Sequence, residues 1–237
     1  MACRTLLLKL ERRGQICLPA RQCPSPNALR NRKRLAVAHD QSPITGELNA
    51  LRPLRLAVLG ARHPDLALFG FILQRYHYLG LRNGVGENLK YLARDRHGRP
   101  LACLLFGSAA WKAKARDRFI GWDPGCRQQR LTRLTNNTRF LVLPWVRVPH
   151  LASHLLSQVC RRLRADWMAK YGHSIELLET FVDRERFRGT CYRAAGWLHV
   201  GATTGRSRND VDNTLRVPVK DIYLLPLTAD FRRRLCT

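Results

Sequence analysis

Acidic residues are what this chain most clearly lacks. It has 17 Asp and Glu against 42 Lys and Arg in 237 residues, which gives a formal net charge of +25 and a pI near 11.1. Such an excess is far more than solubility requires, and it attracts phosphate-bearing polymers at rates that fall as salt is added. The charge balance therefore favours nucleic acid as the partner.

Lysine is scarce as well, because only seven of the basic residues are lysine and 35 are arginine. The planar guanidinium suits bidentate contact with phosphate or guanine better than an ammonium group does. A GC-rich genome would also raise the arginine content of every protein that it encodes. That alternative does not account for the shortage of acids, so both explanations of the arginine bias stay open.

Zinc-binding patterns and long apolar runs are also missing. The eight cysteines form no CxxC pair and no Cys/His pair at finger spacing, which argues against a structural zinc site. No apolar run approaches the roughly 18 residues of a membrane span, and no secretory signal follows Met1. We therefore expect reduced cysteines, a cytoplasmic location and no membrane partner.

Changes in composition predict three parts. Residues 1–19 are a leucine-bearing helix stopped at Gly14 and followed by a short extended piece. This resembles the end of a winged helix whose earlier helices are missing, with a simple helical arm as the alternative. Residues 20–48 form a basic linker with four cations at 30–34, or else a tether without a partner. Residues 49–237 form the main domain.

Periodicity in the main domain predicts helices around one sheet. Strands are expected at 54–59, 89–93, 101–106, 139–146, 175–182 and 221–227, and helices at 63–78, 109–118 and 149–171. Residues 121–137 are predicted to be irregular. The order of elements indicates an α+β fold, with a mixed sheet flanked by helices.

The later elements resemble a known fold. A strand, a long helix, a second strand and then YRAAGWLHVG at residues 192–201 are similar to the acetyltransferase-like (GNAT) topology, over roughly residues 50–227. That resemblance implies a glycine-rich turn whose backbone N–H groups hold the pyrophosphate of acetyl-CoA. The corresponding residues 144–150, PWVRVPH, contain no glycine and two prolines, which lack an N–H. We therefore expect this topology without the acyl-transfer apparatus, and no cofactor.

The densest group of candidate binding residues lies at 176–206. A buried strand leads into an arginine-rich turn, a short helix and Gly-Trp. Closely spaced guanidiniums need an acidic partner or bulk water, and nucleic-acid phosphate fits the overall charge. The candidates for phosphate contact are Arg184, Arg186, Arg188, Arg193, Arg206 and Arg208, with Arg147 from the earlier turn. Tyr78 and His77 are candidates for base stacking, with packing in the core as the alternative.

Two carboxylates beside these arginines suggest a different activity. Glu179 and Asp183 lie on the same side of the predicted strand, and such a pair can bind Mg²⁺ in a nuclease or a DNA strand-transfer enzyme. The alternative is that both acids only neutralise neighbouring arginines. The sequence therefore supports a DNA-binding protein first and a metal-dependent enzyme second.

Six segments together resemble the family of protein A of the Druantia anti-phage defence system. They are YHYLG at 76–80, GENLKYLA at 86–93, RFLVLPWV at 139–146, ETFVDRERFRGTCYRAAGW at 179–197, GRSRND at 205–210 and KDIYLLPL at 220–227. The resemblance implies a defence or mobile-element setting, since similar domains occur with transposases. It also implies other defence proteins, such as a helicase, as partners, and it leaves the chemistry open.

Overall fold

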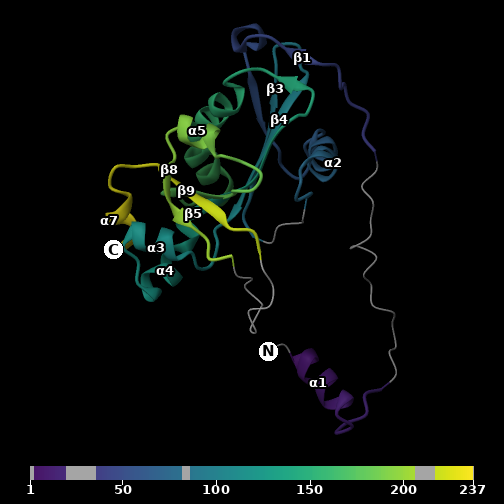
Figure 1. Cartoon of the computed structure of the whole chain (residues 1–237), viewed down its shortest axis with the longest axis vertical. Coiled ribbons are helices and arrows are strands. Elements are labelled where there is room, and N and C mark those ends of the chain that lie inside the picture. The colour runs from purple at the N-terminus through teal and green to yellow at the C-terminus, as the bar shows by residue number, and fades with distance from the viewer. Residues whose placement is uncertain (1–2, 20–35, 82–85, 206–216, 237) are drawn as a thin grey trace. The chain divides into compact units, whose positions relative to one another are not determined.

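The computed structural model describes residues 3–19, 36–81, 86–205 and 217–236 (Figure 1). The chain divides into two units, Met1–Leu35 and Ala36–Thr237. In the first unit, helix α1 (Cys3–Arg12) leaves Leu6 and Leu7 exposed, and the chain turns at Gly14 with a positive φ. The predicted helix is confirmed, and its assignment to a winged helix stays a prediction.

The second unit is built on a seven-stranded sheet with the order β2-β3-β4-β5-β7-β9-β8. The strands are β2 (Arg55–Val58), β3 (Leu89–Arg94), β4 (Pro100–Ser108), β5 (Leu134–Val142), β7 (Leu177–Asp183), β8 (Leu198–Ala202) and β9 (Lys220–Pro226). Among the described strands of this sheet, only β5 and β7 pair in parallel, and every other pair is antiparallel. The prediction of a mixed sheet flanked by helices is confirmed.

Helices cover both faces of the sheet (Figure 1). They are α2 (Leu66–Tyr76), α3 (Lys114–Ile120), α4 (Pro124–Arg130), α5 (Leu151–Tyr171), α6 (Thr190–Ala194) and α7 (Phe231–Cys236), with short 3-10 turns at η2 (Leu48–Leu51) and η3 (Leu131–Arg133). Alternation along β4 shows the two faces: Leu105 packs in the cluster under α2, and Leu104 packs under α5. Because both faces are covered, β4 is buried along nearly its whole length.

The segment before β2 is part of the second unit. Strand β1 (Ile44–Thr45) pairs in parallel with β6 (Val146–Arg147), and Ile44 is only 3% exposed. Nearby, the His39 ring lies 5.4 Å from the ring of Trp145. These contacts tie the last residues of the predicted linker to the sheet domain.

The prediction of irregular structure at 121–137 is wrong. Helix α4 fills part of this stretch, and β5 already begins at Leu134. Asp123 caps α4 by accepting the N–H of Cys126 at 2.8 Å, and Pro124 occupies the first helical position. Asp123 and Pro124 are a helix-start signal, which the sequence prediction missed because the surrounding residues are polar and charged.

Two further helices differ from the sequence prediction. Helix α3 begins at Lys114, so the predicted helix at 109–118 is correct only in its second half. Helix α7 near the end of the chain was not predicted, and it buries Phe231 and Leu235. Within the described residues, no helix is both long enough and apolar enough to cross a membrane.

Replacement of Ile44 by Ala tests whether residues 36–48 are part of the folded unit. We expect a loss of about 2–5 kcal/mol in the free energy of unfolding, because a buried side chain is truncated. Thr45→Ala, at the exposed neighbouring position, should change this value by no more than about 0.5 kcal/mol. Equilibrium urea denaturation measures both, and an unchanged midpoint for Ile44→Ala would contradict the assignment.

Candidate functional site

The parallel contact between β5 and β7 is short. It comprises the three pairs Leu134↔Leu177, Thr135↔Leu178 and Asn136↔Glu179, after which no further pairing joins these two described strands. Strand β7 continues to Asp183 along β9, and β5 continues to Val142 along β4. The two strands therefore part in the middle of the sheet and leave a gap there.

A bulge on β5 lies where the strands part. Leu105 pairs with Arg139 while Phe106 pairs with Asn137, so Thr138 is the extra residue on β5. The side chains of Asn137 and Thr138 both donate to the carbonyl oxygen of Leu105 at 3.3 Å. The bulge is thus held by side-chain hydrogen bonds, and it redirects β5 away from β7.

Polar side chains replace the missing ladder. The Thr180 hydroxyl donates to the Asn137 carbonyl at 3.0 Å, and the Tyr192 hydroxyl donates to Asn137 Oδ1 at 2.7 Å. Asn137 Nδ2 also donates to the carbonyl oxygen of Arg139 at 3.2 Å. Because these buried groups bond one another, they form a rigid polar floor beneath the gap.

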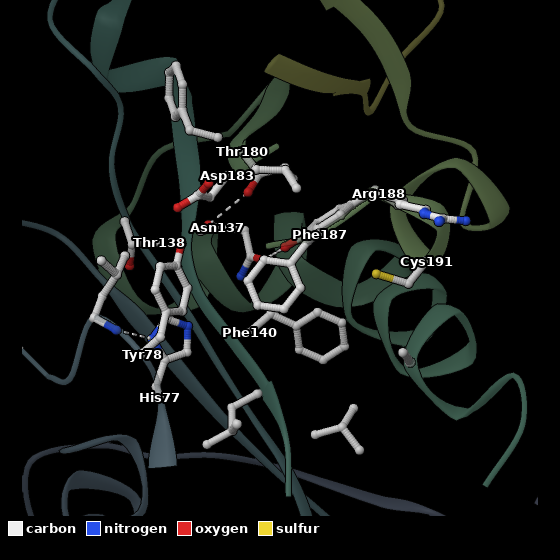
Figure 2. A pocket seen from close by; sticks show the side chains of 18 of the residues that line it. His77, Tyr78, Asn137, Thr138, Phe140, Thr180, Asp183, Phe187, Arg188 and Cys191 are labelled. Carbon is white, nitrogen blue, oxygen red and sulfur yellow. Dashed lines mark hydrogen bonds between the residues drawn. The ribbon is translucent and has the colours of Figure 1, made fainter. Parts of the chain in front are cut away.

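The gap holds a pocket of about 500 Å³ (Figure 2). Its lining is mainly apolar and aromatic, with Phe140, Val142 and Val182 among its walls. Alternation along β7 places Thr180 and Val182 toward α5 and α6, and Phe181 and Asp183 toward the opposite face. The pocket therefore draws residues from both faces of the sheet, and its volume lies in the range of small-ligand sites.

Aromatic side chains surround the mouth of the pocket. The Tyr78 ring stacks on His77 at 4.9 Å and lies 5.5 Å from the ring of Phe187, and the guanidinium of Arg186 lies 5.1 Å above it. Phe187 is 51% exposed although it is large and apolar. In Figure 2 Tyr78 and Phe187 lie on either side of Asn137, and the Tyr78 ring points toward Asp183.

Asp183 is the carboxylate at this mouth, and it is almost fully buried. Its Oδ1 accepts the N–H of Glu185 at 3.1 Å, which stabilises the turn after β7. Its Oδ2 lies 3.7 Å from Arg186 Nε, which is longer than a hydrogen bond. One carboxylate oxygen therefore keeps acceptor capacity on the side of the pocket.

The pKa values at the mouth favour neutral side chains. Burial, helped by the charge of Arg139, lowers the pKa of His77 to about 4, so its ring is uncharged at neutral pH. His77 Nδ1 accepts the N–H of Leu79 at 3.1 Å, which assigns the ring proton to Nε2. Burial also raises the pKa of Tyr78, and the nearby Asp183 carboxylate adds to this effect. Both rings therefore offer neutral donors and flat faces.

The structure gathers most of the predicted binding residues near this mouth. Arg186, Arg188, Tyr78, His77 and Asp183 line the pocket or contact a residue that does. Arg184 precedes Arg186 in the same turn, and Arg193 on α6 donates to the carbonyl of Arg188 at 3.4 Å.

Other predicted residues lie elsewhere. Arg147 is exposed on β6 and is not among the pocket-lining residues, and Arg206 and Arg208 lie outside the described residues. The sequence prediction did not include Asn137, Thr180 or Phe187. Two sequence features could have pointed to them: the polar run Asn136-Asn137-Thr138 inside a strand, and the aromatic Phe187 among arginines.

Glu179 takes part in a buried network on the face of the sheet next to α3. Its side chain is fully buried, 2.8 Å from Arg116 Nη1, and it accepts the N–H of Ala110 at 2.6 Å. Arg116 is also fully buried and pairs with Asp117 at 2.7 Å. Burial raises the pKa of Glu179, and the guanidinium opposes that shift.

The two predicted catalytic carboxylates therefore have different surroundings. Glu179 already bonds a guanidinium and a backbone amide, whereas Asp183 borders the pocket. The described residues contain no group of three or more His, Cys, Asp or Glu that could hold a metal ion. Nothing in this geometry favours a two-carboxylate metal centre.

The sequence matches a known family over most of its length. The family model of the Druantia protein DruA matches residues 27–217. The chain belongs to this family. A comparison with curated proteins gives no match.

Solved structures similar to this DruA-family chain include acetyltransferases. A chimera of Vibrio cholerae spermidine N-acetyltransferase SpeG and hSSAT has a TM-score of 0.50 at 8% identity, covering 76% of this chain and 99% of that one. The V. cholerae enzyme in complex with CoA and spermine gives 0.49 at 8% identity, covering 78% and 98%. A putative acetyltransferase from Acinetobacter baylyi gives 0.45 at 12% identity, covering 73% and 91%. The predicted GNAT-like fold is confirmed, and at these identities the likeness concerns the fold alone.

The acetyl-CoA that this fold implies does not fit the connection between β5 and α5. Pro144 and Pro149 have no N–H, and the N–H of Val146 donates to the Leu143 carbonyl at 2.9 Å. Val146 also belongs to β6, which pairs with β1. The connection that leads into α5 thus offers fewer free backbone donors than a glycine-rich turn would, although His150 at the start of α5 provides no side-chain cap.

Replacement of Arg116 by Met tests the buried network. We expect a loss of about 3–5 kcal/mol in the free energy of unfolding at pH 7, because Glu179 loses its partner and stays buried either as an unpaired charge or as an acid that must take up a proton on folding. The pKa of Glu179 then rises further, so the folded variant holds a proton that the unfolded chain releases. Its stability should therefore fall as pH rises above the usual glutamate pKa of about 4.3.

Urea denaturation at pH 5 and pH 7 measures this effect. The double variant Arg116→Met with Glu179→Gln should regain part of the loss, and Arg118→Met at an exposed position of α3 should be nearly neutral. A double variant no more stable than Arg116→Met alone would show that the ion pair is not what stabilises this region.

Proposed function

We propose that this chain binds DNA as a component of the Druantia anti-phage system, and that it contacts phosphates through the turn between β7 and α6. The observation that carries the proposal is the clustering of Arg184, Arg186, Arg188 and Arg193, all exposed, beside an aromatic-lined pocket. Membership in the DruA family gives the defence setting. The phosphate contacts rest on the charge and placement of these four guanidiniums.

The charge of this cluster is only partly neutralised. Arg184 donates to Asp221 at 2.7 Å, and Arg186 lies 3.7 Å from Asp183. Within the described residues, Arg188 and Arg193 form no ion pair, and both side chains are exposed. Exposed guanidiniums without acids attract a polyanion and release its counterions on contact.

Two acids elsewhere on the domain already pair with arginines. Asp95 pairs with Arg99 at 2.8 Å, and Asp65 pairs with Arg94 at 2.7 Å. Such pairs neutralise cations far from the β7–α6 turn and leave the positive charge of the turn exposed.

Neither competing activity has a specific observation in its favour. A metal-dependent nuclease would use Glu179 with Asp183, but Glu179 is engaged by Arg116. Acyl transfer would need free backbone donors before α5, where this chain has two prolines and a bonded N–H at Val146. We therefore retain DNA binding, without a cofactor, as the proposed function.

Charge reversal at two positions of the turn tests the proposal. In Arg186→Glu with Arg188→Glu, fewer phosphates are neutralised, so fewer counterions are released on binding. The slope of log affinity against log salt should become less steep by about 0.9 for each duplex phosphate that the variant no longer neutralises. Fluorescence anisotropy with a labelled duplex at several salt concentrations measures the slope.

The matched control reverses two exposed arginines away from the pocket, Arg55 on β2 and Arg161 on α5. It changes the net charge equally and should leave the slope nearly unchanged. Equal effects of the two double variants would show that binding follows the total charge and not this turn.

A further inference from the structure

We infer that the pocket between β5 and β7 receives one unstacked nucleobase of the bound strand, and that Asp183 selects a base with an exocyclic amino group. The inference rests on the proposed function, because the arginines of the turn bring the strand to the pocket. It adds a readout of base identity to a surface that otherwise contacts only phosphates. Three features of the pocket carry it.

The first feature is the pair of aromatic faces at the mouth. Tyr78 and Phe187 come from distant parts of the chain, and their rings lie 5.5 Å apart at an angle of 57°. Phe187 is half exposed, so a flat apolar ligand would cover a surface that water now contacts. Single-stranded nucleic acids are bound by stacking of bases on such rings, with arginine planes adding to the stack. Arg186 above Tyr78 supplies such a plane.

The second feature is the single acceptor at the edge of an apolar chamber. Asp183 Oδ1 is used by the turn, and Oδ2 has no partner within hydrogen-bond distance among the residues that the structure describes. The floor groups Asn137, Thr180 and Tyr192 already satisfy one another. A carboxylate accepts from the exocyclic amino group of cytosine, adenine or guanine, whereas thymine has no amino group and its one ring N–H lies between two carbonyl oxygens that the carboxylate repels. The chemistry of this pocket therefore favours an amino-bearing base.

The third feature is a cationic hollow next to the pocket. It has a volume of about 380 Å³, contains Lys112 and Lys220, and shares Asn137, Thr138 and Phe181 with the main pocket. A base inserted between β5 and β7 would bring its backbone phosphate to the mouth, where the hollow and the arginine turn supply cations. Cations near the opening can pair with the phosphate of a nucleotide, whereas a neutral apolar ligand has no charge with which they could interact.

Removal of a base from a duplex costs pairing and stacking energy, and the cost is least in single strands and at mismatches. We therefore expect tighter binding to single-stranded or mismatched DNA than to a fully paired duplex of the same sequence. If the pocket plays no part in binding, single-stranded or mismatched DNA and the paired duplex should differ in affinity only by the effect of their different charge densities.

Free nucleosides test the pocket without phosphate. Deoxycytidine or deoxyadenosine should bind the wild-type chain about tenfold more tightly than thymidine, as measured by NMR titration of the aromatic signals. Asp183→Asn keeps an oxygen for the Glu185 N–H and turns an amide donor toward the ligand. This variant should lose the preference for amino-bearing bases and bind thymidine better than the wild type does.

The matched control is Glu185→Gln, which removes the same charge from an exposed neighbour that does not line the pocket. It should keep the wild-type order of nucleosides. A second measurement uses 2-aminopurine in a single strand, whose fluorescence should change on binding to the wild type and change less with Phe187→Ala.

The outcomes separate the two proposals. Salt-dependent DNA binding without nucleoside binding or a 2-aminopurine response would overturn the base pocket and leave the phosphate surface standing. If the wild type prefers amino-bearing nucleosides, Asp183→Asn loses that preference, and the chain shows no salt-dependent DNA binding, the pocket is supported and the proposed function is overturned. An unchanged nucleoside order in Asp183→Asn would overturn the assigned role of this carboxylate.

Discussion

The parting of β5 from β7 is the constraint on which the functional part of this molecule depends. Three residue pairs join the two strands in a ladder. Beyond the ladder, the side chains of Thr180 and Tyr192 donate hydrogen bonds to Asn137. A continuous ladder would have closed the middle of the sheet. The bulge at Thr138 lies just beyond the last β5–β7 pair, and because a bulge bends its strand, it separates β5 from β7 and leaves room for a pocket.

The excess of arginine shapes the interior as well as the surface. Buried carboxylates are tolerable only where a cation and hydrogen bonds compensate for lost water, and Glu179 with Arg116 meets that condition. Asp183 differs, since its second oxygen lies 3.7 Å from Arg186 Nε, within ion-pair range but beyond hydrogen-bond distance.

The chain has an acetyltransferase-like fold, but one connection in it differs from a typical pyrophosphate-binding turn. The sheet and helices follow an acetyltransferase-like plan, but the connection before α5 carries prolines and a paired N–H where that plan needs free donors. The gap between the parallel strands nevertheless persists, because it arises from strand geometry and not from the cofactor. The fold alone therefore does not decide what the pocket binds.

Sequence by itself determined the charge, the order of most elements and the dense arginine turn after β7, because periodicity and composition are local properties. It failed at α4, where a short capped helix has too few apolar positions to show a period. Only the tertiary structure decided that the rings of Tyr78 and Phe187 are in contact, that Tyr192 donates to Asn137, and that Glu179 forms an ion pair with Arg116. These contacts join residues far apart in the chain, so they depend on strand pairing and register, which local patterns do not encode.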